Sequence, residues 1–109
     1  MTKVTIYRNE KKECVGFRAV GHAGYAYEGE DIVCAAISVL TINTINAIEA
    51  FTDVEASVSS DDETGMIDYR IDKSTKDTTL LLNTMILGLE MIVSNEDYAE
   101  YIDLKFEEV

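Results

Sequence analysis

The sequence predicts an α+β fold, with two helices packed on a mostly antiparallel sheet in the order ββαββαβ. Two observations predict it. Several short segments alternate apolar and polar residues, the period-two pattern of strands that have one buried face. Two longer segments repeat apolar residues at helical spacing. The chain has 109 residues, of which 47% are hydrophobic, so we expect one compact domain over residues 1–109 with a single core.

The strands are expected as two hairpins and a last single strand. Residues 3–10 and 14–23 alternate on either side of the polar segment "NEKKE", which predicts the first hairpin. Residues 54–59 and 66–72 flank the turn "SDDETG" and predict the second, with Gly65 near its turn. Residues 101–109 alternate again and form the expected fifth strand.

The first helix is expected over residues 31–51, "DIVCAAISVLTINTINAIEAF", which is too long for an ordinary strand. Its many β-branched residues lower helix propensity slightly, so packing has to stabilise it. Asp31 is the expected N-cap, and this would place Cys34 in the first turn.

The second helix is expected over residues 74–95, with Ser74 or Thr75 as its cap. This segment is apolar nearly all round, and a helix of that kind is buried on more than one face. One sheet covers only one face. We therefore expect the surplus face to meet a second copy of the chain, in a homodimer.

The charge balance is strongly acidic: 9 basic and 21 acidic side chains give a net charge of −12. Such a surface repels nucleic acid and anionic membranes, so we expect no direct binding to either. It would attract a basic partner such as a ribosomal protein, although solubility alone also explains it. The apolar runs are shorter than the roughly 20 residues of a membrane span, and the N-terminus turns polar too early for a signal peptide. We therefore expect a cytoplasmic protein.

The stretch "GHAGYAYEGEDIVCAAIS" holds the only histidine, His22, and one of the two cysteines, Cys34. A thiolate is stabilised at a helix N-terminus, and the glycine-rich loop can bring an imidazole to it. A cysteine and a histidine within hydrogen-bond reach are the minimum apparatus for acyl transfer. The residues alone leave other interpretations open. Cys34 can be a small buried hydrophobic residue, and His22 a solvated loop residue.

Three further residues are candidates for supporting roles. Gly21 tolerates a tight turn or a close backbone approach. The carboxylate of Asp31 disfavours a nearby thiolate, yet it would orient the site as a cap or as a partner of His22. Ser38 lies one helical turn after Cys34 and would line the pocket. Neither the spacing of His22 with Cys14 and Cys34 nor their number suits a metal, so we expect no metal and no cofactor.

The motif "GHA" followed by "G-x-DIVCAA-x-S" resembles the ribosomal-processing cysteine protease family (Prp). The resemblance implies an endopeptidase that removes a short N-terminal extension from ribosomal large-subunit protein number twenty-seven, next to an aromatic residue. It implies that Cys34 is the nucleophile, that His22 is the general base and acid, and that Asp31 and Ser38 have supporting roles. It also implies a homodimer. The loop "YAYEGE" is this chain's own, and whether its tyrosines stack on substrate or cover the core stays open.

A function of another class also fits the acidic charge. A non-catalytic module would bind a basic ribosomal protein during ribosome assembly without cutting it. Binding to that partner cannot separate the two hypotheses, because both predict it. An activated thiol separates them, since only the protease requires one.

Overall fold

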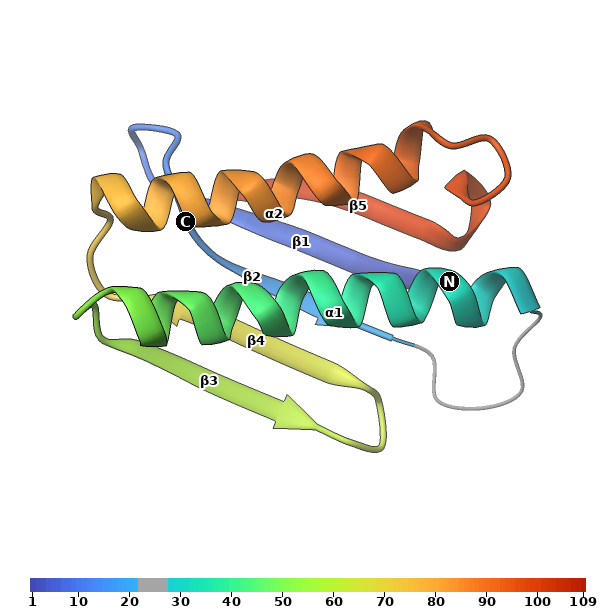
Figure 1. Ribbon diagram of the computed structural model, residues 1–109, viewed down its shortest axis with the longest axis horizontal. Helices are drawn as coiled ribbons and strands as arrows, with labels where there is room; N and C mark the ends of the chain where they lie inside the picture. The colour runs from blue at the N-terminus through green and yellow to red at the C-terminus, as the bar shows by residue number, and fades with distance from the viewer. Residues whose placement is uncertain (22–27) are drawn as a thin grey trace.

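The structure, a computed structural model, describes residues 1–21 and 28–109 (Figure 1). Its elements follow in the predicted order ββαββαβ, with one short 3-10 turn before the last strand. They are β1 (Thr2–Arg8), β2 (Cys14–Val20), α1 (Glu28–Phe51), β3 (Ala56–Asp61), β4 (Met66–Ile71), α2 (Lys76–Ser94), the 3-10 turn (Ala99–Tyr101) and β5 (Ile102–Glu108).

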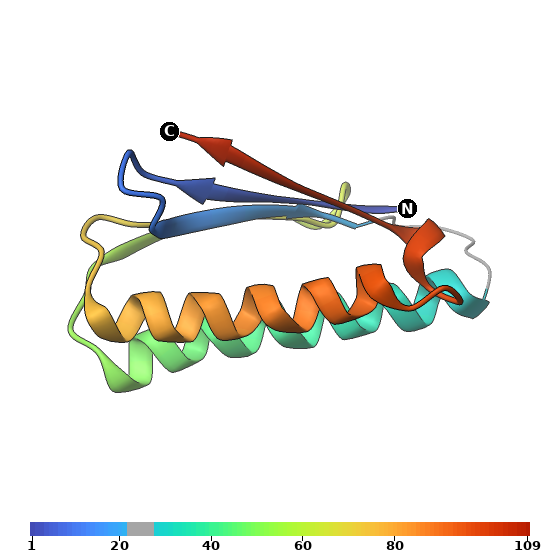
Figure 2. The ribbon, with the colours of Figure 1, turned by 90° about the horizontal axis from the view of Figure 1, so that it is seen from above.

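The five strands form one sheet in the order β3-β4-β2-β1-β5. Every neighbouring pair is antiparallel except β1 and β5, which are parallel. Figure 2 shows both helices side by side on one face of this sheet. The arrangement confirms the predicted α+β class, because the two hairpins supply the antiparallel pairs and the chain returns through α2 to the edge of β1.

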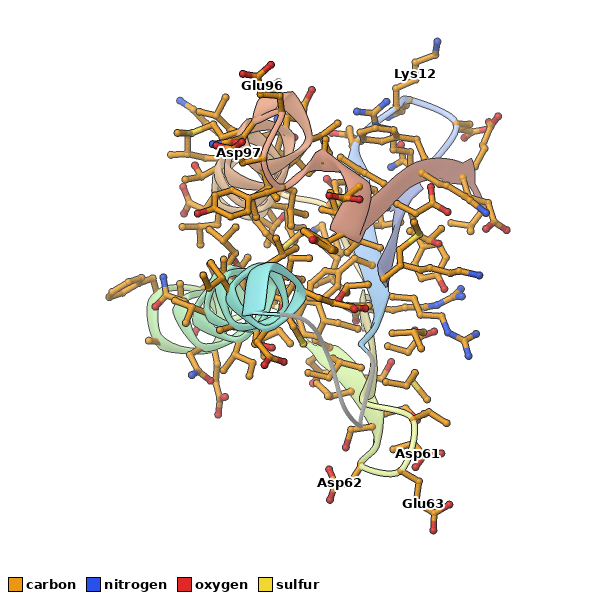
Figure 3. All side chains as sticks on the ribbon, turned by 90° about the vertical axis from the view of Figure 1, so that its right-hand side faces the viewer. Lys12, Asp61, Asp62, Glu63, Glu96 and Asp97 are labelled. Carbon is orange, nitrogen blue, oxygen red and sulfur yellow. The ribbon has the colours of Figure 1, made fainter. Side chains whose placement is uncertain are left out.

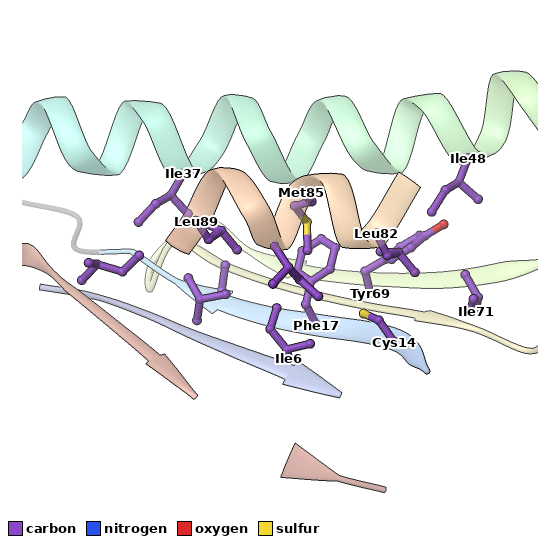
Figure 4. Close-up of a cluster of buried hydrophobic side chains, with 14 of the residues drawn as sticks. Ile6, Cys14, Phe17, Ile37, Ile48, Tyr69, Ile71, Leu82, Met85 and Leu89 are labelled. Carbon is purple, nitrogen blue, oxygen red and sulfur yellow. The ribbon is translucent and has the colours of Figure 1, made fainter. Parts of the chain in front are cut away.

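The core lies between the sheet and the two helices (Figure 4). Strand β1 shows why its sequence alternates: Val4 and Ile6 are fully buried, Thr5 between them is half-buried, and Lys3 before them is exposed. The rings of Phe17 and Tyr69 on neighbouring strands pack with their centroids 5.6 Å apart. From the helices come Val33, Ile37, Ile48, Leu82, Met85, Ile86 and Leu89. This apolar burial is the main term that stabilises the fold.

The buried face of α1 also carries two threonines, which satisfy their hydroxyl groups locally. Thr41 donates a hydrogen bond to the carbonyl oxygen of Ile37 at 2.9 Å, and Thr44 donates to that of Leu40 at 2.7 Å. A buried hydroxyl bonded in this way avoids most of the cost of leaving water. The β-branched residues of the segment therefore suit a helix that packing stabilises.

Two glycines allow close approaches between elements. A Cβ atom on Gly16 would lie 2.1 Å from the carbonyl oxygen of Tyr69, so no side chain fits where β2 meets β4. A Cβ on Gly88 would lie 2.8 Å from a methyl carbon of Leu40, so the absent side chain lets α1 and α2 pack closely.

The outer face of the helix pair is apolar and exposed. Leu80, Leu87 and Met91 on α2 keep 66%, 61% and 68% of their surfaces exposed. Within a single chain α2 packs on the sheet and on α1, and its remaining face is exposed; that a second copy of the chain covers this face stays a prediction. By length and hydropathy alone, α1 and α2 would also suffice to span a membrane, a test that core helices of soluble proteins pass as well.

The cap of α2 yields a prediction on stability. The hydroxyl of Thr75 accepts a hydrogen bond from the backbone N–H of Thr78 at 3.1 Å, and the hydroxyl of Thr78 accepts one from the backbone N–H of Thr75 at 2.8 Å. Thr75→Ala removes one half of this capping box, so it should lower the free energy of unfolding by about 1 kcal/mol. Urea denaturation followed by circular dichroism measures the loss.

Thr84→Ala is the matched control, because Thr84 is an exposed interior residue of the same helix whose hydroxyl bonds the carbonyl of Leu80. It should change the stability by less than about 0.5 kcal/mol. Equal losses in the two variants would show that the capping box contributes nothing.

Candidate active site

Cys34 lies in the second turn of α1, not in the first. The helix begins at Glu28, three residues before the expected start, so the prediction that Asp31 is the N-cap is wrong. Asp31 instead lies in the first turn with an exposed side chain. The free N–H groups of a helix belong to its first four residues, here 28–31, and the effect of the helix dipole fades beyond the first turn. Cys34 therefore lies beyond the free N–H groups of the helix start, and not among them as the sequence suggested.

A cavity of about 130 Å³ opens beside Cys34, where the start of α1 meets one end of the sheet. Four segments of the chain form its wall, so the fold itself builds this site. Thr2 comes from β1, Ala19 comes from β2, and Gly21 directly follows β2. The other lining residues are Cys34, Ile37, Ser38 and Thr41 from α1, Gly65 just before β4, and Ile67 from β4. The side chain of Cys34 is partly exposed, as a nucleophile that meets substrate must be.

Two glycines, Gly21 and Gly65, form part of the cavity wall. The backbone N–H of Gly21 donates to the carbonyl oxygen of Gly65 at 3.0 Å, which extends the pairing of β2 with β4 by one residue. Gly65 has φ +66°, a conformation that favours glycine. A Cβ atom on Gly21 would lie 3.4 Å from the Sγ atom of Cys34, so a larger residue there would narrow the approach to the thiol.

The structure brings together three of the five predicted site residues. Gly21, Cys34 and Ser38 line the same cavity, whereas Asp31 does not line it. His22, together with Tyr25 and Tyr27, lies outside the described residues. Sequence reasoning missed Thr2 and placed Gly65 only in a turn. The register that pairs Val20 with Met66 brings Gly65 to the site, and no local sequence pattern predicts that register.

The second cysteine has a different environment. Cys14 is buried in the core, with 1% of its surface exposed, and its thiol donates to the carbonyl oxygen of Gly16 at 3.4 Å. Burial raises the pKa of the Cys14 thiol, against smaller opposite effects of that hydrogen bond and of the charge on Arg8. Both cysteines are free thiols. Of the two, only Cys34 has the exposure that a nucleophile needs.

The end of the molecule that holds Cys34 is acidic. Asp61, Asp62 and Glu63 lie on the turn that leads into Gly65, and Figure 3 shows them projecting from that turn at this end of the molecule. Glu30 in the first turn of α1 accepts a hydrogen bond from the amino group of Met1. Within the described ranges, no three histidine, cysteine or acidic side chains gather as metal ligands would.

Comparison with known proteins finds relatives that match nearly the whole chain. The family model described as "Cysteine protease Prp" matches residues 1–103. The ribosomal processing cysteine protease Prp of Staphylococcus aureus strain Mu50 is 32% identical over 107 residues, which are 97% of this chain and 99% of that protein. The protein of the same name from Bacillus subtilis strain 168 is 28% identical over 105 residues, 92% of each chain.

Solved structures match over nearly the whole chain as well. The Staphylococcus aureus protease in complex with a substrate peptide has a TM-score of 0.88 at 30% identity, covering 98% of this chain and all of that one. The same protease with a covalently linked product peptide has a TM-score of 0.84 at 31% identity, with the same coverage. A protein from Streptococcus mutans has a TM-score of 0.86 at 30% identity, covering all of this chain and 99% of that one. The chain is a cysteine-type peptidase and belongs to the ribosomal processing cysteine protease Prp family.

Proposed function

We propose that this peptidase removes an N-terminal extension from ribosomal large-subunit protein number twenty-seven, with Cys34 as nucleophile and His22 as general base and acid. The observation that carries the proposal is the cavity that brings the partly exposed Cys34 together with Gly21 and Ser38. Relatives named as ribosomal processing proteases, one of them solved with a substrate peptide, support the class of substrate.

The chemistry assigned to the pair is acyl transfer in two steps. The thiolate of Cys34 attacks the scissile carbonyl carbon, a C–S bond forms, and the C–N bond breaks as the imidazolium of His22 protonates the leaving amine. His22 then takes a proton from water. The hydroxide equivalent attacks the thioester, which releases the new carboxylate and restores the thiol. The reaction needs no cofactor, because Cys34, His22, the peptide and water supply every proton and every bonding electron.

The charge of the chain supports a basic substrate. The net charge is −12, and the acidic residues 61–63 stand on the turn that leads into Gly65 at the cavity. A basic peptide is drawn toward such a surface, and the attraction weakens as salt screens it. Ribosomal proteins are basic and are synthesised in the cytoplasm, where we place the reaction.

The first test is cleavage of a peptide that spans the N-terminal extension of the ribosomal protein from the same organism. The wild type should cut it at one site, because the thiol lies in a cavity open to substrate. Cys34→Ala should abolish cleavage, and His22→Ala should lower its rate by roughly 10²- to 10⁴-fold, the usual contribution of acid–base catalysis. Mass spectrometry identifies the products and their rates.

Cys14→Ala is the matched control, since it removes a thiol that lies in the core and should leave the cut site unchanged. Circular dichroism of each variant separates lost chemistry from lost structure. Tight binding of the peptide without cleavage by any form would favour the non-catalytic module. Cleavage by Cys34→Ala would exclude this residue as the nucleophile.

Thiol alkylation tests the nucleophile without a substrate. Iodoacetamide near neutral pH should modify Cys34 well before Cys14, because Cys14 is buried and burial raises the pKa of its thiol. Peptide mapping over time gives both rates. The rate at Cys14 should rise only in alkali, and it should rise together with unfolding. Folding raises the pKa of this thiol, so the protonated thiol contributes stability that is fully present below its unfolded pKa and is lost as the pH rises through its folded pKa. Equal rates at both cysteines near neutral pH would contradict the assignment.

We also propose that two copies of the chain pair through the outer face of the helices. A groove of about 600 Å³ runs between α1 and α2, and its lining is almost wholly apolar. The exposed side chains of Leu80, Leu87 and Met91 continue the apolar surface beyond the groove. A monomer seldom leaves a continuous apolar surface of this kind in water, whereas a two-fold interface buries it on both copies.

Met91→Glu should therefore convert the dimer to a monomer, because the interface would bury an unpaired charge. Analytical ultracentrifugation at micromolar concentration measures the mass. Val58→Glu is the control, since Val58 is 55% exposed but lies on β3 and does not line the groove between α1 and α2, so it should leave the dimer intact. A monomeric wild type, or equal effects of the two substitutions, would refute the interface.

A further inference from the structure

A second groove lies between the C-terminal half of α1 and β3, toward the end of α1 that is opposite Cys34. We call it the edge groove, because β3 is an edge strand of the sheet (Figure 1). Its volume is about 390 Å³. Its apolar wall includes Ile45 and Ile48 of α1 and Ala56 and Val58 of β3. The edge groove is therefore separate from the cavity beside the thiol.

Two carboxylates line the edge groove without a partner. Glu49 belongs to the last turns of α1 and Asp53 follows the helix, and both side chains are exposed. Neither carboxylate forms a salt bridge or a hydrogen bond with another residue that the structure describes. No lysine or arginine lines the groove. Negative charge beside an apolar wall complements a cation that has an aliphatic stem.

The hydroxyl of Tyr69 is a third polar group of the edge groove. Tyr69 has 2% of its surface exposed, and its hydroxyl end points toward Ile48 (Figure 4). Within the described part of the chain this hydroxyl makes no hydrogen bond. Burial raises its pKa, and the nearby carboxylate of Glu49 raises the pKa further. Because buried hydroxyls are nearly always bonded, one that reaches a groove indicates a ligand group that completes it.

The free edge of β3 adds backbone groups beside the same groove. The backbone N–H of Asp72 donates to the carbonyl oxygen of Glu55 at 3.1 Å, so this pair is a hydrogen-bonded one in the ladder of β3 and β4. Such pairs alternate along an antiparallel ladder, and residues 56, 58 and 60 therefore direct their N–H and C=O groups to the free edge. Residues 56–60 include no charge and no proline, the usual protection of an edge against a further strand.

We propose that the edge groove and the free edge of β3 bind an extended basic segment of the substrate, with one lysine or arginine side chain in the groove. This inference rests on the proposed function. The backbone of the segment pairs with β3, and its side chains beside Ala56 and Val58 point to the same face, toward α1. The aliphatic stem packs on the apolar wall. The cation meets Glu49 and Asp53 and donates a hydrogen bond to the hydroxyl oxygen of Tyr69.

The edge groove is too far from the thiol to hold the residues that flank the cut. Cys34 and Glu49 are fifteen residues apart on one helix, a distance of roughly 22 Å at the usual rise per residue. An extended chain covers this distance with about seven residues. The bound cation is therefore at least about seven residues from the scissile bond, and the cavity beside Cys34 still selects the residues at the cut.

The experiment compares cleavage of two substrates, the whole ribosomal protein with its extension and a peptide of about five residues on each side of the cut. The wild type should cut the whole protein with a kcat/KM about tenfold higher, the size of one good hydrogen bond to a charged group, because only the protein reaches the edge groove. Glu49→Gln combined with Asp53→Asn should lower this ratio to about one. Tyr69→Phe keeps the ring and removes the hydroxyl, so it should lower the ratio by about threefold to tenfold.

Glu107→Gln combined with Glu108→Gln is the matched control, because it makes the same change of net charge on β5, at the opposite edge of the sheet. Its ratio should stay that of the wild type. Glu49→Gln alone replaces the double variant if circular dichroism shows that the latter misfolds. An unchanged ratio in the groove variant, an equal fall in the control, or equal rates on both substrates in the wild type would overturn the inference and leave the proposed function standing. Cleavage of neither substrate by the wild type would overturn both.

Discussion

The site depends on the pairing of β2 with β4. Their antiparallel register places Val20 opposite Met66, and the next residue continues the ladder through the hydrogen bond from Gly21 to Gly65. This bond fixes Gly21 so near the Cys34 thiol that a Cβ atom added to Gly21 would lie 3.4 Å from the Sγ atom, while Gly65 forms another part of the cavity wall. The hairpin of β3 and β4 therefore does more than extend the sheet. It also carries an acidic turn to this end of the molecule and supplies backbone to the wall of the cavity that Cys34 lines.

The same packing explains why one thiol is buried and the other borders a cavity. Cys14 begins β2 and points into the layer between sheet and helices, where burial raises its pKa and excludes any peptide. Cys34 lies near the other end of β2, where the sheet ends. The polar residue Ser38, one turn later on the same helix, lines the cavity with it. The core must be close-packed and dry, so a cavity that admits substrate can form only at its edge. Position relative to the core, and not the residue type, distinguishes these two cysteines.

The order of elements and the class of fold were predictable from the sequence, because the buried faces impose periods of two and 3.6 residues. Thr75 was predictable as a cap for a similar reason, since its chemistry is local. The start of α1 was not. The carboxylate of Asp31 suggested a cap, yet the helix continues through this residue to Glu28. Acidic residues stabilise the first turn as well as the cap, so residue type alone does not separate these positions.

The candidate site was predictable only where its residues are close in sequence. Cys34 and Ser38 are one turn apart, so a helix at that position already places them together. Thr2, Gly65 and Ile67 reach the same cavity because β1 pairs with β2 and β2 pairs with β4, and these pairings join residues as far apart in sequence as Gly16 and Arg70 and leave no local pattern. Thr2 gives a particular reason for this limit. In the sequence it is one polar residue at the start of an alternating strand, a position where threonine is common. Among the threonines that the structure describes, Thr2 is set apart by a buried hydroxyl without a hydrogen-bond partner, in a cavity that it shares with a thiol from another element.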